Sequence, residues 1–260
     1  KRILGMGCAV IEADALLPRR NRPLLLAWQS LLRGQSVDAI IANPPWGADL
    51  LHSRSDLKGA GYGLAEGQFD SFDLFVELSL KLVKTGGVIA LIVPDSLFLP
   101  EHQSLRRLLV EQTQIELIAR LGEGFFPGVY RGTAVIICKK QRPLDTHNVA
   151  CLRLSKSCRD EVLSGILALR TARQQLVHLV PQSRFLKDLT VRFDIDVTER
   201  ERQTVKVISS CGGSWTRWLI SSRGVELSKR GTVVYCPACN AARPLPQTST
   251  GVVCTNCEFS

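Results

Sequence analysis

Short apolar runs alternate with segments of helical periodicity over residues 1–142. Apolar residues recur at helical spacing over 72–83 (FDLFVELSLKLV) and over 101–111, whereas the short runs have the length and composition of strands. Gly86-Gly87 supplies the glycine that commonly ends a helix. This alternation is typical of an α/β domain with a parallel sheet. The predicted strands lie at 8–11, 37–42, 88–93, 115–121 and 133–138.

The pattern changes after residue 142. One further helix is predicted at 161–177, and residues 178–230 are mixed and basic. We therefore expect an α/β part followed by a smaller mixed C-terminal module. The predicted divisions are the α/β part at 1–142, a linker helix with the start of a basic region at 143–231, and a small terminal module at 232–260.

Composition narrows the class of protein. With 260 residues, 45% of them apolar, the chain can bury one good core and a smaller module. It has no apolar run of about 18 residues, so no membrane span is expected. The formal net charge of +9 favours a polyanionic partner, nucleic acid above all, although a generic basic surface carries the same sign.

Five of the nine cysteines are scattered along the chain. Several lie in apolar runs, which is typical of reduced cysteines that pack as small hydrophobic residues. A reducing, cytoplasmic setting fits this usage better than a disulfide framework. The scattered cysteines are Cys8, Cys138, Cys151, Cys158 and Cys211.

Asn43-Pro44-Pro45-Trp46 follows the run 37–42 (VDAIIA), which reads as a buried parallel strand. These residues suit a ligand site at the carboxyl end of a strand better than core packing. An exocyclic ring amine is a weak nucleophile because its lone pair is delocalised. The Asn43 side-chain oxygen and the Pro44 carbonyl can accept its two hydrogens, and Trp46 can stack on the ring. The alternative is a simple strand terminator.

The tetrapeptide at 43–46 resembles the catalytic motif of N6-adenine DNA methyltransferases, in the branch of TaqI-type and Eco57I-type restriction–modification enzymes. The resemblance continues at 73–75 (DLF) and at 121–127 (LGEGFFP). It implies a partial, Rossmann-like class I methyltransferase sheet, S-adenosylmethionine as methyl donor and double-stranded DNA as partner. It also implies that the target adenine leaves the base stack before it is methylated.

The resemblance assigns a second aromatic residue to the flipped base, opposite Trp46. Phe126, just before the proline of the 121–127 stretch, matches this position best, and Phe125 and Tyr130 are the alternatives. The alternative interpretation is that these aromatic residues belong to a hydrophobic loop that only packs on the sheet.

Two residues are expected at the cofactor by the same resemblance. Asp14 ends the strand before the catalytic one and corresponds to the acid that binds the adenine amino group of S-adenosylmethionine. Phe75 is expected to line the cofactor pocket. The alternatives are a turn aspartate and a core phenylalanine on a helix.

One part of the resembled pattern is missing. The family's glycine-rich cofactor loop lies upstream of the position of Asp14, and Gly5-Met6-Gly7 is too close to Asp14 to serve. We therefore expect an internal fragment whose cofactor loop comes from a preceding segment or from a partner chain. Alone, such a chain binds the cofactor weakly or not at all.

Two CxxC pairs near the end of the sequence have the pattern of a metal site. Cys236 and Cys239 form the first pair, and Cys254 and Cys257 form the second. Four thiolates at this spacing can surround Zn²⁺ tetrahedrally, with a hairpin between the pairs. This predicts a structural zinc ribbon at 232–260, with unligated thiols or a redox pair as alternatives.

A basic stretch at 222–231 (SRGVELSKRG) precedes the predicted ribbon. The resembled enzymes carry a similar stretch in their target-recognition part, so Arg223, Lys229 and Arg230 are candidate nucleic-acid contacts. A solvated basic loop is the alternative. Since a recognition part would continue further, truncation at the C-terminus is also expected.

Together these patterns predict a site-specific DNA methyltransferase that acts on adenine N6, as part of a restriction–modification or related defence system. The alternatives are a protein-glutamine or ribosomal-RNA methyltransferase, which use a similar Asn-Pro-Pro-aromatic turn. A third alternative is a non-catalytic DNA-binding fragment or a subunit that depends on a partner.

Overall fold

A computed structural model describes residues 14–17, 37–47, 50, 52–126, 128–129, 131–212, 233–239 and 242–244. The chain divides into two compact units, Lys1–Thr198 and Glu199–Ser260. Within the described residues, no helix has the length and apolar character needed to cross a membrane.

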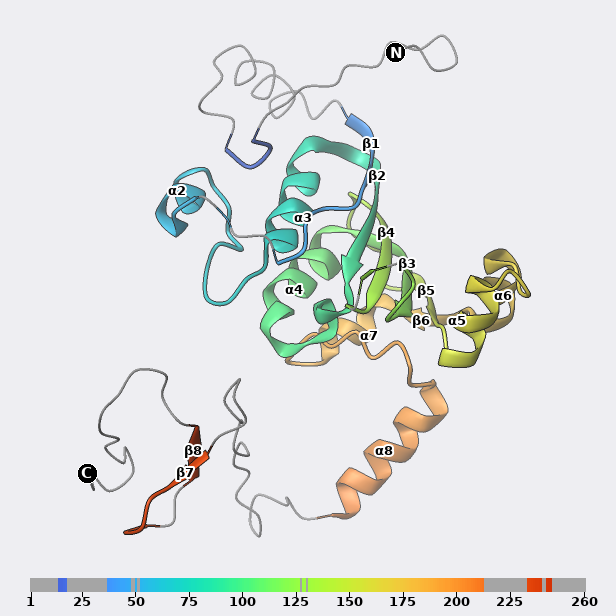
Figure 1. Cartoon of the computed structure of the whole chain (residues 1–260). Helices are drawn as coiled ribbons and strands as arrows, with labels where there is room; N and C mark the ends of the chain where they lie inside the picture. The colour runs from blue at the N-terminus through green and yellow to red at the C-terminus, as the bar shows by residue number, and fades with distance from the viewer. Residues whose placement is uncertain are drawn as a thin grey trace. The chain divides into compact units, whose positions relative to one another are not determined.

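In its described residues the first unit is built on a six-stranded sheet with the order β1-β2-β4-β3-β5-β6 (Figure 1). The sheet continues beyond residue 142, so the predicted division at that position falls inside it. The strands are β1 (Val37–Ala42), β2 (Val83–Pro94), β3 (Gln114–Gly122), β4 (Thr133–Lys139), β5 (Asn148–Arg153) and β6 (His178–Pro181).

The α/β sheet expected from the sequence is present, but it is mixed and not purely parallel. β1 pairs with β2 and β3 pairs with β5 in parallel, but β4 lies antiparallel between β2 and β3. The reason is the short connection at 123–132. A parallel neighbour needs a crossover of about a dozen residues or more, usually with a helix, whereas a short loop returns the chain antiparallel.

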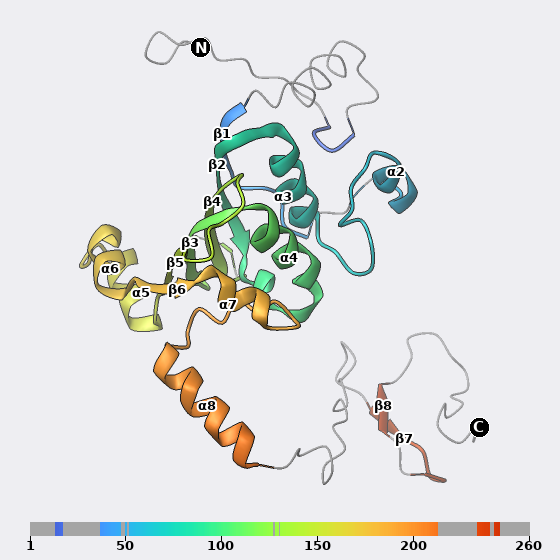
Figure 2. The same cartoon turned by 180° about the vertical axis from the view of Figure 1, so that it is seen from behind.

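Helices cover the sheet on both faces (Figures 1 and 2). The predicted helices at 72–83 and 101–111 are present as α3 and α4. The helices of the first unit are α2 (Arg54–Gly59), α3 (Ser71–Leu82), α4 (Gln103–Gln112), α5 (Lys156–Leu163), α6 (Leu169–Leu176) and α7 (Gln182–Lys187), with 3-10 turns at Asp95–Phe98 and Pro100–His102.

Two predicted helix boundaries were wrong. The helix expected at 161–177 is split into α5 and α6, because Gly165 adopts a φ of 77° and ends the first of them. Gly86 and Gly87 do not end α3, which stops at Leu82. They lie within β2, at the point where its register with β1 shifts.

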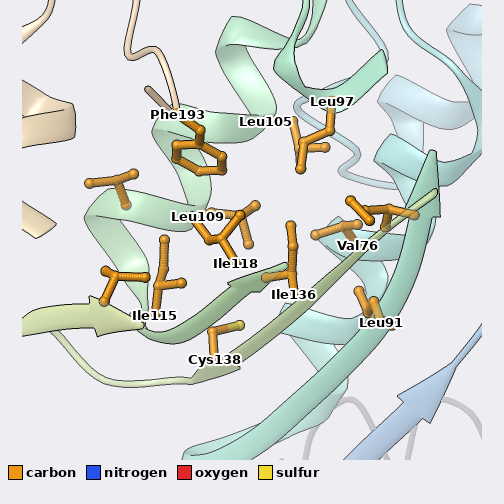
Figure 3. Packing of buried hydrophobic residues seen from close by; sticks show 14 of the residues in the cluster. Val76, Leu91, Leu97, Leu105, Leu109, Ile115, Ile118, Ile136, Cys138 and Phe193 are labelled. Carbon is orange, nitrogen blue, oxygen red and sulfur yellow. The ribbon is translucent and has the colours of Figure 1, made fainter. Parts of the chain in front are cut away.

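The main core lies between one face of the sheet and helices α3, α4 and α7. Figure 3 shows its side chains converging from the strands and from the helices that cover them. A second cluster on the opposite face joins β3 and β5 to α5 and α6. Representative members of the main core are Val76, Leu91, Leu109, Ile118 and Ile136.

Strand β1 is present where it was predicted, but it is not buried. It stands at the edge of the described sheet, none of its residues is fully buried, and the Ile41 side chain is 86% exposed. The continuous apolar run predicted a buried strand. Among the described residues, β1 pairs with β2 on one side and with no strand on the other.

The second unit contains helix α8 (Glu199–Cys211) and a small antiparallel pair, β7 (Val233–Tyr235) and β8 (Ala242–Pro244).

We predict that Gly87→Ala destabilises the first unit. A Cβ at this position would lie 2.8 Å from the Asp38 carbonyl oxygen and 2.6 Å from Val83 Cγ2, so β1 would have to move away from β2. Urea unfolding should show a loss of about 1–3 kcal/mol. The control is Gly59→Ala at the end of α2, where a Cβ meets nothing within 4 Å. Equal stability of the two variants would contradict the prediction.

The scattered cysteines give a second prediction. Cys138 and Cys151, which lie in apolar runs, are buried as expected, whereas Cys158 is half-buried and Cys211 is exposed. Burial raises the pKa of Cys138 to about 11 and that of Cys151 to about 12. Cys8 lies outside the described residues.

Because the thiolate is the nucleophile, alkylation at pH 8 should modify Cys211 at least about 100-fold faster than Cys138 or Cys151. Peptide mapping after iodoacetamide treatment measures the three rates, and the difference should narrow as the pH rises toward 11. In the control, the denatured chain, the three cysteines should react at similar rates. Similar rates in the folded chain would contradict the raised pKa values of Cys138 and Cys151.

Candidate functional site

The Asn43 turn, residues 43–46, lies directly beyond the end of β1. Because β1 and β2 are parallel, this turn and Asp95 lie at the same edge of the sheet. Asn43 and Pro45 are exposed, whereas Pro44 is buried. The Asn43 amide is exposed and has no hydrogen bond to another described residue.

The N-terminus of α3 holds this turn in place. The Gly47 N–H donates to Asp70 Oδ1 at 2.6 Å, and the Ser71 hydroxyl donates to the Pro45 carbonyl at 2.7 Å. Sequence reasoning missed Asp70 and Ser71. The signal was present, since an acid and a serine just before an apolar helical run mark a helix start, but it did not show what the start would contact.

Trp46 is partly buried and packs against the main core. Its indole Nε1 is shielded from solvent and has no hydrogen-bond partner among the described residues. A buried, unpaired donor costs about 1–3 kcal/mol, which tertiary packing of the ring must offset. The ring is therefore held by the protein and is not a freely rotating surface side chain.

The loop after β3 carries the predicted second aromatic. Phe125 packs against the cluster of β3 and β5, and Phe126 meets it edge-on with ring centroids 5.5 Å apart. Phe126 is half-buried and makes no ring contact with Trp46. Tyr130 lies outside the described residues. Of the two phenylalanines, Phe125 is committed to packing, which leaves Phe126 as the better candidate for a ligand.

Arg131, just before β4, joins this loop to the Asn43 turn. Its guanidinium lies 3.6 Å from Asp70 Oδ2 and extends over Gly47. Sequence reasoning also missed this residue, because an arginine in a loop carries no local signal of its partner.

A second acid at the same edge binds a second arginine. Asp95, directly after β2, pairs with Arg120 at 3.2 Å, and the Arg120 guanidinium also lies over the Phe98 ring. Gly132 approaches Asp95 so closely that a Cβ there would lie 2.2 Å from its carboxylate. Asp70 and Asp95 therefore each bind an arginine next to the loop that carries Phe125 and Phe126. Arg120 lies in β3, before this loop, and Arg131 lies at its end.

Asp14 lies in a short described segment that ends at Leu17. Its carboxylate accepts hydrogen bonds from the Leu16 and Leu17 amides and pairs with His52. Tyr62 closes the segment by donating to the Leu16 carbonyl, and burial raises the pKa of this tyrosine well above its usual range. The carboxylate is 40% exposed, so it can still reach a ligand.

Phe75 lies on α3 and packs against a third cluster, which also contains Leu16 and Leu17. The structure therefore brings the two predicted cofactor residues, Asp14 and Phe75, to one region. The Phe75 ring is partly buried among apolar neighbours, which agrees with the alternative of a core phenylalanine as well.

The predicted metal ligands are only partly covered. Cys236 is buried at the end of β7, and Cys239 lies in the turn that follows. Cys254 and Cys257 lie outside the described residues. Within the part of the chain that the structure describes, no three side chains of the ligand types gather around a common point.

The three predicted nucleic-acid contacts, Arg223, Lys229 and Arg230, also lie outside the described residues.

Comparison with known families places part of this chain in a described family. Residues 20–126 match the model of the Eco57I restriction-modification methylase family. The matched segment includes the Asn43 turn, helices α3 and α4, strand β3 and Phe126. The family resemblance inferred from the sequence is therefore confirmed over this segment.

Three solved structures are similar in part. A protein assigned as a class I S-adenosylmethionine-dependent methyltransferase from Listeria monocytogenes is 26% identical, with 51% of this chain and 41% of that chain covered and a TM-score of 0.39. A type I restriction-modification methyltransferase subunit from Streptococcus thermophilus is 17% identical, with 62% and 38% covered and a TM-score of 0.45. The type IIG restriction endonuclease BpuSI is 20% identical, with 67% and 22% covered and a TM-score of 0.46.

The chain thus spans less than half the length of each of these proteins.

Proposed function

We propose that this chain carries the base-binding part of a DNA methyltransferase that moves a methyl group from S-adenosylmethionine to adenine N6. The observation that carries the proposal is the Asn43 turn: an exposed amide with no hydrogen bond to the described residues, at a strand end, on a turn that two hydrogen bonds join to the start of α3. The family match over residues 20–126 supports it.

The chemistry follows from the two acceptors. S-adenosylmethionine supplies an electrophilic methyl group on a sulfonium. The Asn43 side-chain oxygen and the Pro44 carbonyl accept the two N6 hydrogens and draw the amine toward tetrahedral geometry, which returns its lone pair from the ring. The N6 lone pair forms the new bond to the methyl carbon, the carbon–sulfur bond breaks, and one N6 proton passes to solvent.

Two aromatic residues hold the adenine outside the duplex. Trp46 offers a ring already fixed against the core, and Phe126 offers a half-buried ring in the loop after β3. Stacking on such rings stabilises a flipped base by about 1–3 kcal/mol per ring, which offsets part of the cost of unstacking.

Asp14 and Phe75 are the residues proposed to contact the cofactor. Since Asp14 Oδ1 already accepts two backbone amides and Oδ2 meets His52, a cofactor amino group would share or replace the His52 contact. Within the described residues β1 is an exposed edge strand, which supports the proposal that a further segment or a partner chain completes this half of the site.

For the C-terminal unit, we propose a structural zinc ribbon held by Cys236, Cys239, Cys254 and Cys257. Arg223, Lys229 and Arg230 in the basic stretch before it are proposed to contact DNA, chiefly its phosphates.

Methyl transfer from tritiated S-adenosylmethionine to mixed-sequence duplex DNA tests the reaction. Asn43→Ala should lower the transfer by at least about 100-fold, because one of two acceptors for the amine is lost. Asn148→Ala, an exposed asparagine on β5, is the matched control and should leave the rate unchanged. Mass analysis of nucleosides should identify N6-methyladenine.

Other outcomes of this experiment count against the proposal. Label in protein or RNA in place of DNA would favour a glutamine or ribosomal-RNA methyltransferase. Label in DNA that persists in Asn43→Ala would remove the Asn43 turn from the mechanism. No transfer, with DNA binding intact, would favour a chain that needs a partner for activity.

The zinc proposal has its own test. Metal analysis of the purified chain should find about one zinc per chain, and Cys254→Ser should lose it because a structural site needs all four ligands. Cys211→Ser changes an exposed cysteine of the same unit and should retain the metal. A chain without zinc, or Cys254→Ser with full occupancy, would contradict the ribbon.

A further inference from the structure

The two prolines leave the Asn43 turn with few groups through which the protein can hold it. Pro44 and Pro45 have no N–H, so neither can donate a backbone hydrogen bond. Among the described residues, the hydrogen bonds that connect the turn to the rest of the fold are made by the Pro45 carbonyl and by the N–H of Gly47, the next residue. Both reach the first residues of α3.

Asp70 is the common acceptor at this junction. Its Oδ1 accepts the Gly47 N–H at 2.6 Å and lies 2.9 Å from the Ser71 hydroxyl. The Ser71 hydroxyl oxygen also lies 2.7 Å from the Pro45 carbonyl oxygen. Because a hydroxyl has a single proton, Ser71 can donate to only one of these two acceptors at a time. Asp70 and Ser71 therefore hold the turn on both sides of Trp46, one through an N–H and one through a carbonyl.

The Asp70 carboxylate also contacts the loop between β3 and β4, which carries Phe126. Its Oδ2 pairs with Arg131, whose guanidinium extends over Gly47. Gly47 has a φ of 62°, a left-handed conformation that favours glycine, and the Arg131 guanidinium lies over it, with Nη1 2.8 Å from where a Cβ would stand. Arg131 closes the loop that carries Phe126. The Asp70 side chain is only 18% exposed, which keeps these contacts from full competition with water.

We propose that Asp70 is a positioning residue for the methyl transfer proposed above, acting through the Gly47 N–H to fix the Asn43 turn. This inference rests on the proposed function. The acceptor oxygen matters more than the charge, because the hydrogen bond to Gly47 is short and the Arg131 contact, at 3.6 Å with a 58% exposed arginine, is loose. Misplacement of a reacting group by about 1 Å can cost about 100-fold in rate.

The experiment compares Asp70→Ala with Asp70→Asn in the full chain. Asparagine retains an oxygen acceptor for Gly47 and is an equally good residue at a helix start. Asp70→Ala should lower the single-turnover rate of methyl transfer by about 10–100-fold, with the Kd for DNA changed by less than about threefold. Asp70→Asn should restore the rate to within about fivefold of wild type.

The control is Asp56→Ala, which removes an acid from the first turn of α2 without touching the Asn43 turn, and it should keep the wild-type rate. A wild-type rate in Asp70→Ala would overturn the proposal. So would an equal loss in Asp70→Ala and Asp70→Asn, or a loss confined to DNA binding.

A second readout separates this inference from the proposed function. Hydrogen exchange of the Gly47 amide, measured by NMR on the ¹⁵N-glycine-labelled chain, should be about tenfold faster in Asp70→Ala and near wild type in Asp70→Asn. If the wild-type chain transfers no methyl group, the proposed function fails for this chain, and the exchange rates still decide whether Asp70 holds the turn. Unchanged exchange in Asp70→Ala would overturn the inference whatever the activity.

Discussion

The pairing of β2 with β1 on one side and β4 on the other is the constraint on which the rest of the structure depends. Because β2 is parallel to β1, the Asn43 turn and Asp95 come to one edge of the sheet. Because β2 is antiparallel to β4, the start of β4, with Arg131 just before it, reaches the same edge. A slip of one residue would turn the buried face of β2 away from the core and separate these groups.

At this edge of the sheet, two aspartates bind backbone amides or arginine side chains of neighbouring loops and strands. Asp70 accepts from the Gly47 amide and pairs with Arg131, and Asp95 pairs with Arg120. A loop without regular hydrogen bonding needs such partners wherever it is shielded from water. The match to the Eco57I restriction-modification methylase family ends at residue 126, so it includes both acids but not Arg131.

Local patterns in the sequence predicted most elements of the first unit but not their neighbours. The apolar spacing at 72–83 and 101–111 is a property of each segment alone, and α3 and α4 formed there. The split of the helix at 161–177 depended on one glycine, Gly165, whose backbone freedom allows but does not require a break. The position of β4 and the exposure of β1 depend on pairing between distant segments, which periodicity does not encode.

The sequence by itself was sufficient to identify the motif at 43–46, to place it after a strand, and to indicate the family resemblance that the match over residues 20–126 confirms. These are local in the chain, so residue type and order were sufficient. Only the tertiary structure decided that Asp70 and Arg131 meet at this turn, that Trp46 is fixed against the core, and that Phe125 packs while Phe126 stays half-open. Such contacts join segments far apart in the chain, and their partners are set by the order and direction of the strands.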